Sequence, residues 1–310
     1  MRVKRRRRLI SVTVIAVLHC VSPTVQAQDA RPESPPLLAF DEQTEQRMLL
    51  LAREPRRVID ETREQLVVET DAVRRALLHL TLSQAFYTLV NPDEALREAD
   101  AGLQLIDETT QPWLFHHLLL ARANALDIHG QAELGVPLAQ RAVRWATQHQ
   151  HVDLSIDARA SLGLLQLTLG NYDSALEALQ QAYALAQTRE SATAPEHIAS
   201  LIALVFEYRG EDALSIPYFE ESLAHYREID DQINVSNSLY GLGRALRNEG
   251  QVERGLALLE ESAAISERLD DVQGLAYTHK ELAETYLLQR DYSRAEAYFS
   301  RALDAFAEVD

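Results

Sequence analysis

The stretch LAETYLLQRDYSRAEAYFSRA at residues 282–302 contains the pattern that decides the fold. Its small residues Ala283, Ala295 and Ala302 are spaced by twelve and then seven positions, and the same spacing recurs upstream with a period of 40. The three periodic sets are Ser83, Ala123, Gly163, Ala203, Gly243 and Ala283; Ala95, Gly135, Ala175, Ser215, Gly255 and Ala295; and Gly102, Ala142, Ala182, Ser222, Ser262 and Ala302. A fixed period between about 20 and 50 residues predicts one supersecondary unit stacked many times.

Each 40-residue unit divides into two amphipathic helical runs, so the predicted unit is a helical hairpin. A glycine suited to the left-handed end of a helix recurs between the runs at Gly130, Gly170, Gly210 and Gly250. The first unit instead has the helix start Asn91-Pro92-Asp93-Glu94, and an upstream helix is predicted to start at Glu54-Pro55-Arg56. The aspartate pairs 230–231 and 270–271 are predicted to cap the helices that follow them.

The periodic small residues mark where two helices approach closely, because facing side chains must be small there. Large residues at other fixed phases are predicted to fill the core: Phe86, Leu126, Phe206, Leu246 and Tyr286, with Gln166 as the polar exception, and Leu179, Phe219, Leu259 and Phe299. Around Phe299 an apolar side is expected to stay open. Pro137 and Pro217 share one phase inside a second helix, where each is expected to bend that helix.

This pattern of small and large positions resembles the tetratricopeptide repeat. The matching residues are Leu162-Gly163, Gly170-Asn171-Tyr172, Ala175, Leu179 and Ala182; Leu242-Gly243, Gly250, Leu259 and Ser262; and Leu282-Ala283, Tyr286, Tyr292, Ala295, Phe299 and Ala302. The family's usual unit is shorter than the 40 residues found here, so both helices are expected to be extended. The resemblance implies an all-α fold, a right-handed superhelical α-solenoid of about six hairpins with a shorter N-terminal hairpin.

The predicted domain organisation follows the repeat phase. A signal peptide is expected at residues 1–27, a flexible leader at 28–39, and an atypical helical hairpin at 40–72. The six repeat units are predicted at about 73–110, 111–150, 151–190, 191–230, 231–270 and 271–310.

The first residues are typical of a secretory signal, with an uncleaved anchor as the alternative. Six basic residues precede the apolar run Leu9–Val21, and Val25-Gln26-Ala27 forms a small-x-small cleavage site. Cleavage after Ala27 removes six of 30 basic and none of 47 acidic residues, so the net charge becomes −23. It also removes Cys20, the only cysteine. We therefore expect an exported protein, in the bacterial periplasm, that has no disulfide and repels nucleic acid.

Motifs for catalysis and cofactors are absent from the sequence. No nucleophile elbow, phosphate-binding glycine loop, HExxH motif or EF-hand loop is present. The dense histidines are His116-His117 and the pair His149 and His151, and ordinary solvated histidines are the simpler interpretation for the loop pair. We expect a protein that is not an enzyme and binds neither cofactor nor metal.

A candidate contact surface follows from the resemblance, which implies that the first helix of each hairpin lines a concave groove. The candidate residues at the groove-facing phases are Asn237, Tyr240, Arg244, Arg247, Asn248, Tyr277 and Lys280. Their arginine and amide groups resemble the carboxylate clamp of some family members, although Gly241 stands where the clamp has an asparagine. The alternative is that they are ordinary exposed residues paired with neighbouring glutamates. If they form the contact surface, removing Arg244 and Arg247 is expected to abolish capture of a partner and to change stability by no more than about 1 kcal/mol.

Two functions are compatible with these features. The first is an exported scaffold that binds a peptide or protein segment in its groove. The second is a periplasmic sensory region, because the chain resembles the exported N-terminal region of bacterial membrane-bound signalling proteins of the diguanylate cyclase or histidine kinase type. Membrane association would then require a longer parent chain.

Overall fold

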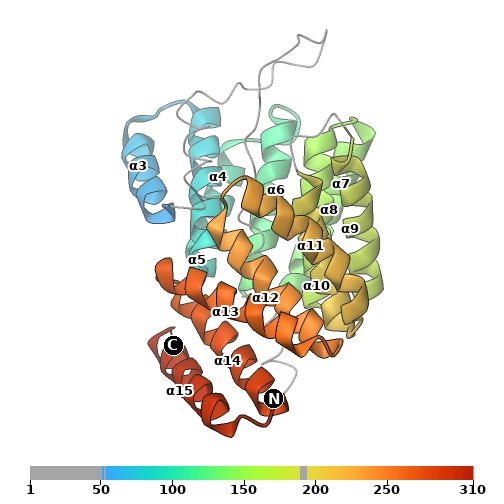
Figure 1. Ribbon diagram of the computed structural model, residues 1–310. Coiled ribbons are helices and arrows are strands. Elements are labelled where there is room, and N and C mark those ends of the chain that lie inside the picture. The colour runs from blue at the N-terminus through green and yellow to red at the C-terminus, as the bar shows by residue number, and fades with distance from the viewer. Residues whose placement is uncertain (1–50, 52–53, 189–193, 310) are drawn as a thin grey trace. The chain divides into compact units, whose positions relative to one another are not determined.

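The computed structural model describes residues 51, 54–188 and 194–309, and these residues form thirteen helices and no strand (Figure 1). The first is α3 (Pro55–Val68), which begins where the sequence predicts a helix start. The others form six hairpins: α4 (Ala72–Thr88) and α5 (Pro92–Leu105), α6 (Pro112–Ile128) and α7 (Ala132–Gln148), α8 (Val152–Thr168) and α9 (Tyr172–Ala186), α10 (Pro195–Arg209) and α11 (Asp212–Glu228), α12 (Gln232–Asn248) and α13 (Val252–Arg268), α14 (Val272–Leu288) and α15 (Tyr292–Val309). The predicted all-helical solenoid fold is confirmed. The predicted signal peptide, the leader and the start of the N-terminal hairpin lie outside the described residues.

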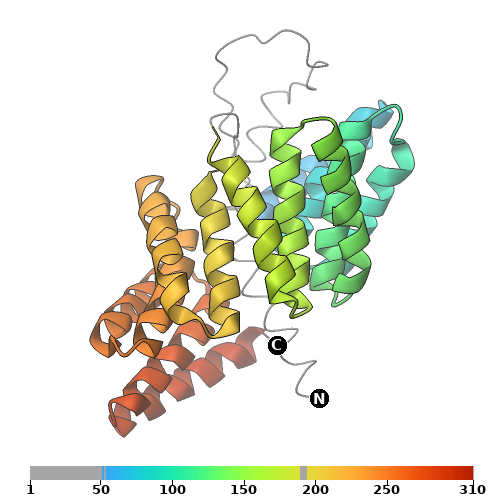
Figure 2. The same ribbon diagram turned by 90° about the vertical axis from the view of Figure 1, so that its right-hand side faces the viewer.

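The chain divides into two compact units, residues 1–198 and 199–310. In the first unit each helix from α3 to α9 packs against the next along the chain, and the first helices α4, α6 and α8 also contact one another. Figure 2 shows α6 to α9, in green, side by side. In the second unit α11 to α15 pack in the same succession, and α12 contacts α14. Each unit therefore stacks hairpins through their first helices.

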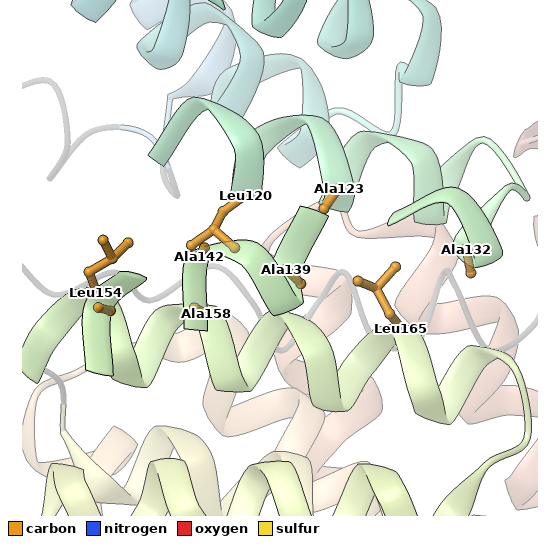
Figure 3. Packing of buried hydrophobic residues seen from close by; sticks show 9 residues of the cluster. Leu120, Ala123, Ala132, Ala139, Ala142, Leu154, Ala158 and Leu165 are labelled. Atoms are coloured by element: carbon orange, nitrogen blue, oxygen red, sulfur yellow. The ribbon is translucent and has the colours of Figure 1, made fainter. Parts of the chain in front are cut away.

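Small residues lie where the two helices of a hairpin meet, as predicted. A Cβ atom at Gly163 would lie 2.6 Å from the Leu179 side chain, and one at Gly243 would lie 2.9 Å from Leu259. Ser83 donates a hydrogen bond of 2.8 Å from its hydroxyl to the Ala95 carbonyl across the first hairpin. The α6–α7–α8 cluster shows the same principle, since Figure 3 places alanines of α7 between leucines of the flanking helices. Larger side chains there would push the helices apart.

The large residues at fixed phases form the core. Phe86, Leu126, Phe206, Leu246 and Tyr286 are buried, as are Leu179, Phe219 and Leu259. Phe299 on α15 is the exception at 36 % exposed, and Leu303 on the same helix is 69 % exposed. The apolar side expected to stay open around Phe299 is thus present within unit 2.

The turns inside the hairpins share one left-handed residue. Gly130, Gly170, Gly210 and Gly250 have φ of 82°, 79°, 75° and 81°, which confirms their predicted role. The same phase holds Val90 at 55° and Arg290 at 61° in the first and last hairpins, which the sequence pattern did not predict. The predicted caps are present, because Asn91, Asp231 and Asp271 accept hydrogen bonds from backbone amides of α5, α12 and α14. Helices α7 and α11 continue past Pro137 and Pro217, and the expected bends stay a prediction.

Candidate binding site

Charged and polar side chains from four helices meet in the second unit. We call them the ionic cluster, which comprises Glu207 of α10, Asp212 of α11, Tyr240, Arg244, Arg247 and Asn248 of α12, and Lys280, Glu281 and Glu284 of α14. The first helices α10, α12 and α14 supply all of these residues except Asp212. Five of the seven predicted contact residues belong to this cluster.

Arg244 joins the three first helices. Its guanidinium lies 2.8 Å from a carboxylate oxygen of Glu207 and 3.7 Å from one of Glu281. It also donates to the Tyr240 hydroxyl at 3.1 Å and lies over that ring, 5.4 Å from the centroid. Burial opposes the charge of Arg244, but the surrounding oxygens, led by those of Glu207, hold its pKa above the ordinary value. The arginine therefore stays charged and is fixed in place by both neighbouring hairpins.

Arg247 is buried, with 8 % of its side chain exposed. Its guanidinium lies 2.8 Å from the Glu281 carboxylate and donates to the Glu281 carbonyl at 3.3 Å. It also donates to the Asn248 amide oxygen at 3.1 and 3.2 Å, and Asn248 donates in turn to Asp212 at 3.0 Å. Arg247 is thus held by partners within the chain, and a ligand carboxylate would have to displace Glu281 to reach it.

Lys280 lies at the more open edge of the ionic cluster, where it contacts Glu281 at 2.9 Å and Glu284 at 2.8 Å. Its side chain is 42 % exposed, and that of Glu284 is 40 % exposed. Burial raises the pKa of Glu281, but Arg244, Lys280 and Arg247 outweigh it and hold that pKa below the ordinary value. Burial raises the pKa of Glu207 to about 7, against the opposing effect of Arg244.

The two remaining predicted residues lie elsewhere on the same helices. Asn237 is half-buried on α12, one turn before Tyr240. Tyr277 of α14 packs edge to face on Phe306 of α15, with 5.2 Å between ring centroids. Burial raises the pKa of Tyr277. Whether any of the seven residues contacts a ligand stays a prediction.

The structure corrects the expected environment of the two arginines. The alternative interpretation made them exposed residues paired with glutamates; they are paired, but Arg247 is buried and the side chain of Arg244 is 25 % exposed. Removing both is therefore expected to destabilise the protein, contrary to the expectation from sequence. Their acidic partners Glu207, Glu281 and Glu284 were missed. A signal for two of them exists, because Glu284 follows Arg244 by 40 residues and Glu207 precedes Arg247 by 40.

The histidines of the first unit have structural contacts. His116 and His149 both stack on the Trp145 indole, with ring centroids 4.7 and 4.5 Å from that of the indole. His151 accepts a hydrogen bond from the Leu154 amide and so caps α8. In the part of the chain that the structure describes, no group of three or more metal-ligating side chains is arranged to hold an ion. No helix in that part is both long and apolar enough to cross a membrane.

Comparison with protein families agrees with this geometry. Models described as tetratricopeptide repeat match residues 236–308, which include most of the ionic cluster, and residues 156–189. These two stretches are tetratricopeptide repeats. The repeats share the 40-residue phase of the other hairpins, and no curated protein matches the chain significantly.

Several solved structures are similar to the chain. The apo form of RapI is 13 % identical, with a TM-score of 0.63 over 85 % of this chain and 96 % of that one. A Rap protein complexed with competence and sporulation factor is 13 % identical, with a TM-score of 0.66 over 90 % and 89 %. The Cut9–Hcn1 hetero-tetramer of the APC/C is 16 % identical, with a TM-score of 0.64 over 84 % of this chain and 45 % of that one. At these identities the similarity establishes the fold alone.

Proposed function

We propose that the protein is an exported, non-catalytic tetratricopeptide repeat scaffold that binds a polypeptide segment against its first helices. The contact surface is centred on the ionic cluster of the second unit, at its more open edge formed by Arg244, Lys280 and Glu284. This edge offers both donors and acceptors within a few ångströms, which suits the alternating polar groups of a polypeptide main chain.

The proposal rests on the ionic cluster, because a contribution to folding stability is a poor explanation for its buried charges. Moving charged groups out of water is costly, and well-packed apolar residues in their place are often as stable or more so. Arg247, Glu207 and Glu281 are nevertheless buried between first helices, whereas leucines and alanines fill the contacts between α6, α7 and α8. An ordered set of donors and acceptors at a helix face is instead what recognition of a polar partner requires.

The balance of charge refines the expected ligand. Three basic side chains of the ionic cluster are paired with Glu207, Glu281 and Glu284, so the cluster does not present an uncompensated positive patch. A ligand with many carboxylates would have to displace these glutamates. We therefore favour a polypeptide that contributes main-chain polar groups and at most one carboxylate, which would contact Lys280.

Two of the similar structures contain partners, namely competence and sporulation factor with a Rap protein and Hcn1 with Cut9. These partners support a binding role for stacked helical hairpins. Export to the periplasm is part of the proposal, and the basic and apolar residues that precede Ala27 support it.

A periplasmic sensory region remains the second candidate, in which the membrane and catalytic parts belong to a longer parent protein. This alternative predicts that the gene encodes a spanning helix and a cyclase or kinase domain after the codon for Asp310. A stop codon there would eliminate it.

Affinity capture from the fraction to which the protein is exported tests the scaffold function. The variant Lys280→Ala removes a half-exposed donor, and Arg254→Ala is the matched control because Arg254 lies on α13 with 63 % of its side chain exposed. We expect the partner to be lost with Lys280→Ala and kept with Arg254→Ala, while both variants keep the free energy of unfolding within about 1 kcal/mol of the native value. Equal capture by both variants would remove the ionic cluster from the binding surface.

A further inference from the structure

The first unit contains a buried carboxyl group that has no cationic partner among the described residues. Asp127 of α6 is 3 % exposed, and one carboxylate oxygen accepts a hydrogen bond of 3.3 Å from the Thr168 hydroxyl. The other oxygen, Oδ1, is buried and has no hydrogen-bond partner within residues 54–188 and 194–309. Buried polar atoms are nearly always satisfied, so an unsatisfied carboxylate oxygen requires an explanation.

The repeat shows what is missing. Glu207 occupies the equivalent position two hairpins later, and it is paired with Arg244, which follows it by 37 residues. The residue 37 positions after Asp127 is Leu164 of α8, which is buried at 2 % exposure. In the second unit the carboxyl group at this position thus has the guanidinium of Arg244 as its partner. The first unit has the isobutyl side chain of Leu164 at the position of that arginine.

Among the residues that the structure describes, no other base replaces it. The neighbouring first helices present Tyr87 from α4 and Thr168 from α8, and burial together with the charge of Asp127 raises the pKa of Tyr87 well above its ordinary value. The equivalent groove-facing phases of α4, α6 and α8 contain no lysine or arginine. His117 at such a phase of α6 is kept neutral, because burial lowers its pKa to about 3. Burial correspondingly raises the pKa of Asp127 to about 7.

Two further acceptors lie on the same helices. The Oε1 atom of Gln84 on α4 is buried, and no described residue forms a hydrogen bond with it. Asp157 on α8 has no ion pair with a basic side chain of the described residues. Tyr87 and Asn124 beside Asp127 are only half-buried, which leaves this face accessible next to the carboxyl group. An acceptor-rich face without a base suits a ligand that brings its own positive charge.

We propose that the face of α4, α6 and α8 binds an ammonium or guanidinium group, with Asp127 as its counter-charge and Thr168 beside it. The group is supplied by a basic side chain of a polypeptide partner. The cation site stands independently of the ionic cluster, and only the polypeptide source rests on the proposed function.

Carboxyl-carbon NMR of aspartate-labelled protein tests the site at the atom concerned. Asp127→Asn assigns the resonance, and n-butylammonium chloride serves as a probe for a lysine side chain against sodium chloride at equal ionic strength. We expect n-butylammonium to lower the pKa of Asp127 by at least about half a unit. The carboxyl resonance of Asp100, which is half-exposed and already paired with Arg122, serves as the control and should be the same in both salts. Identical titration of Asp127 in the two salts would overturn the proposal.

Two further experiments test whether a positive charge beside Asp127 is what the site binds, and whether a polypeptide supplies it. Leu164→Arg should lower the pKa of Asp127 without any probe and abolish the response to n-butylammonium, because a fixed guanidinium beside the carboxyl group favours its charged form. A response that survives in the folded variant would contradict the site. A peptide with blocked termini and one central lysine should lower the pKa of Asp127 at a lower concentration than n-butylammonium does. The same peptide with norleucine in place of lysine should leave that pKa unchanged. Equal potency of peptide and free amine would overturn the polypeptide source. Failure of this site would leave the capture experiment with Lys280→Ala unaffected.

Discussion

Replacement of Arg247 by methionine tests whether the ionic cluster is a buried, mutually dependent network. The guanidinium lies 2.8 Å from the Glu281 carboxylate, and the two side chains are 8 % and 5 % exposed. Breaking a buried ion pair by removing one partner typically costs about 3–5 kcal/mol. Lys280 and Arg244 remain close to Glu281 in the variant, so we expect a loss of about 2–4 kcal/mol in the free energy of unfolding.

The double variant distinguishes a lost ion pair from lost packing. Arg247→Met combined with Glu281→Met replaces both charges with apolar groups of similar length, which is often close to neutral. We therefore expect a coupling energy of about 1–3 kcal/mol in the double-mutant cycle. Urea unfolding followed by circular dichroism gives the four free energies, and Arg254→Met on α13 is the exposed control.

The pH dependence follows from the sign of the Glu281 shift. Because its pKa is held below the ordinary value in the folded state, its stabilising contribution is present above the unfolded pKa and is lost as pH falls through the folded pKa. The penalty of Arg247→Met should thus be larger at neutral pH than in acid. A penalty equal to that of Arg254→Met, or one that does not change with pH, would refute the reasoning.

Three other substitutions test the fold and its buried acid. Val90→Gly should stabilise the protein by about 0.5–1 kcal/mol in urea unfolding, because Val90 has φ of 55° where other repeats have glycine; no gain would show that this turn is unstrained. The pKa of Asp127 is raised to about 7 by burial, so its contribution to stability is present below about pH 4 and is lost as pH rises through 7. The free energy of unfolding of Asp127→Asn should therefore rise relative to that of the native chain by on the order of 2–4 kcal/mol between pH 4 and pH 8. Parallel pH profiles of the two free energies would contradict the burial argument. Gly163→Val should cost about 1–3 kcal/mol, since its Cβ would lie 2.6 Å from Leu179, and an unchanged midpoint would mean that the hairpin is loosely packed.

Much of the fold was predictable because it depends on local steric rules. A small residue at Gly163 or Gly243 is required by the close approach of its own hairpin partner, and Gly130 is required by the left-handed turn. Such requirements recur in every copy and therefore appear as a period in the sequence. Val90 and Arg290 escaped prediction because they adopt the same conformation without being glycine.

The composition of the candidate site was only half predictable for a different reason. The basic and aromatic residues of α12 stood out against an acidic chain, but their partners lie on the neighbouring first helices. Arg244 pairs with Glu207 and Glu281, 37 residues before and after it, and Arg247 approaches Glu284 at the same separation. This offset comes from how adjacent first helices lie against each other, and a 40-residue period alone does not reveal it.

Site-specific photo-crosslinking in a cell that expresses the protein tests the central claim most directly. A photoreactive amino acid at Lys280, on the more open edge of the ionic cluster, is compared with one at Ala264, which is exposed on the second helix of the preceding hairpin. We predict a crosslink to a polypeptide partner from position 280 and none from position 264. Crosslinks from position 264 alone, or equally from both, would contradict binding at the first helices.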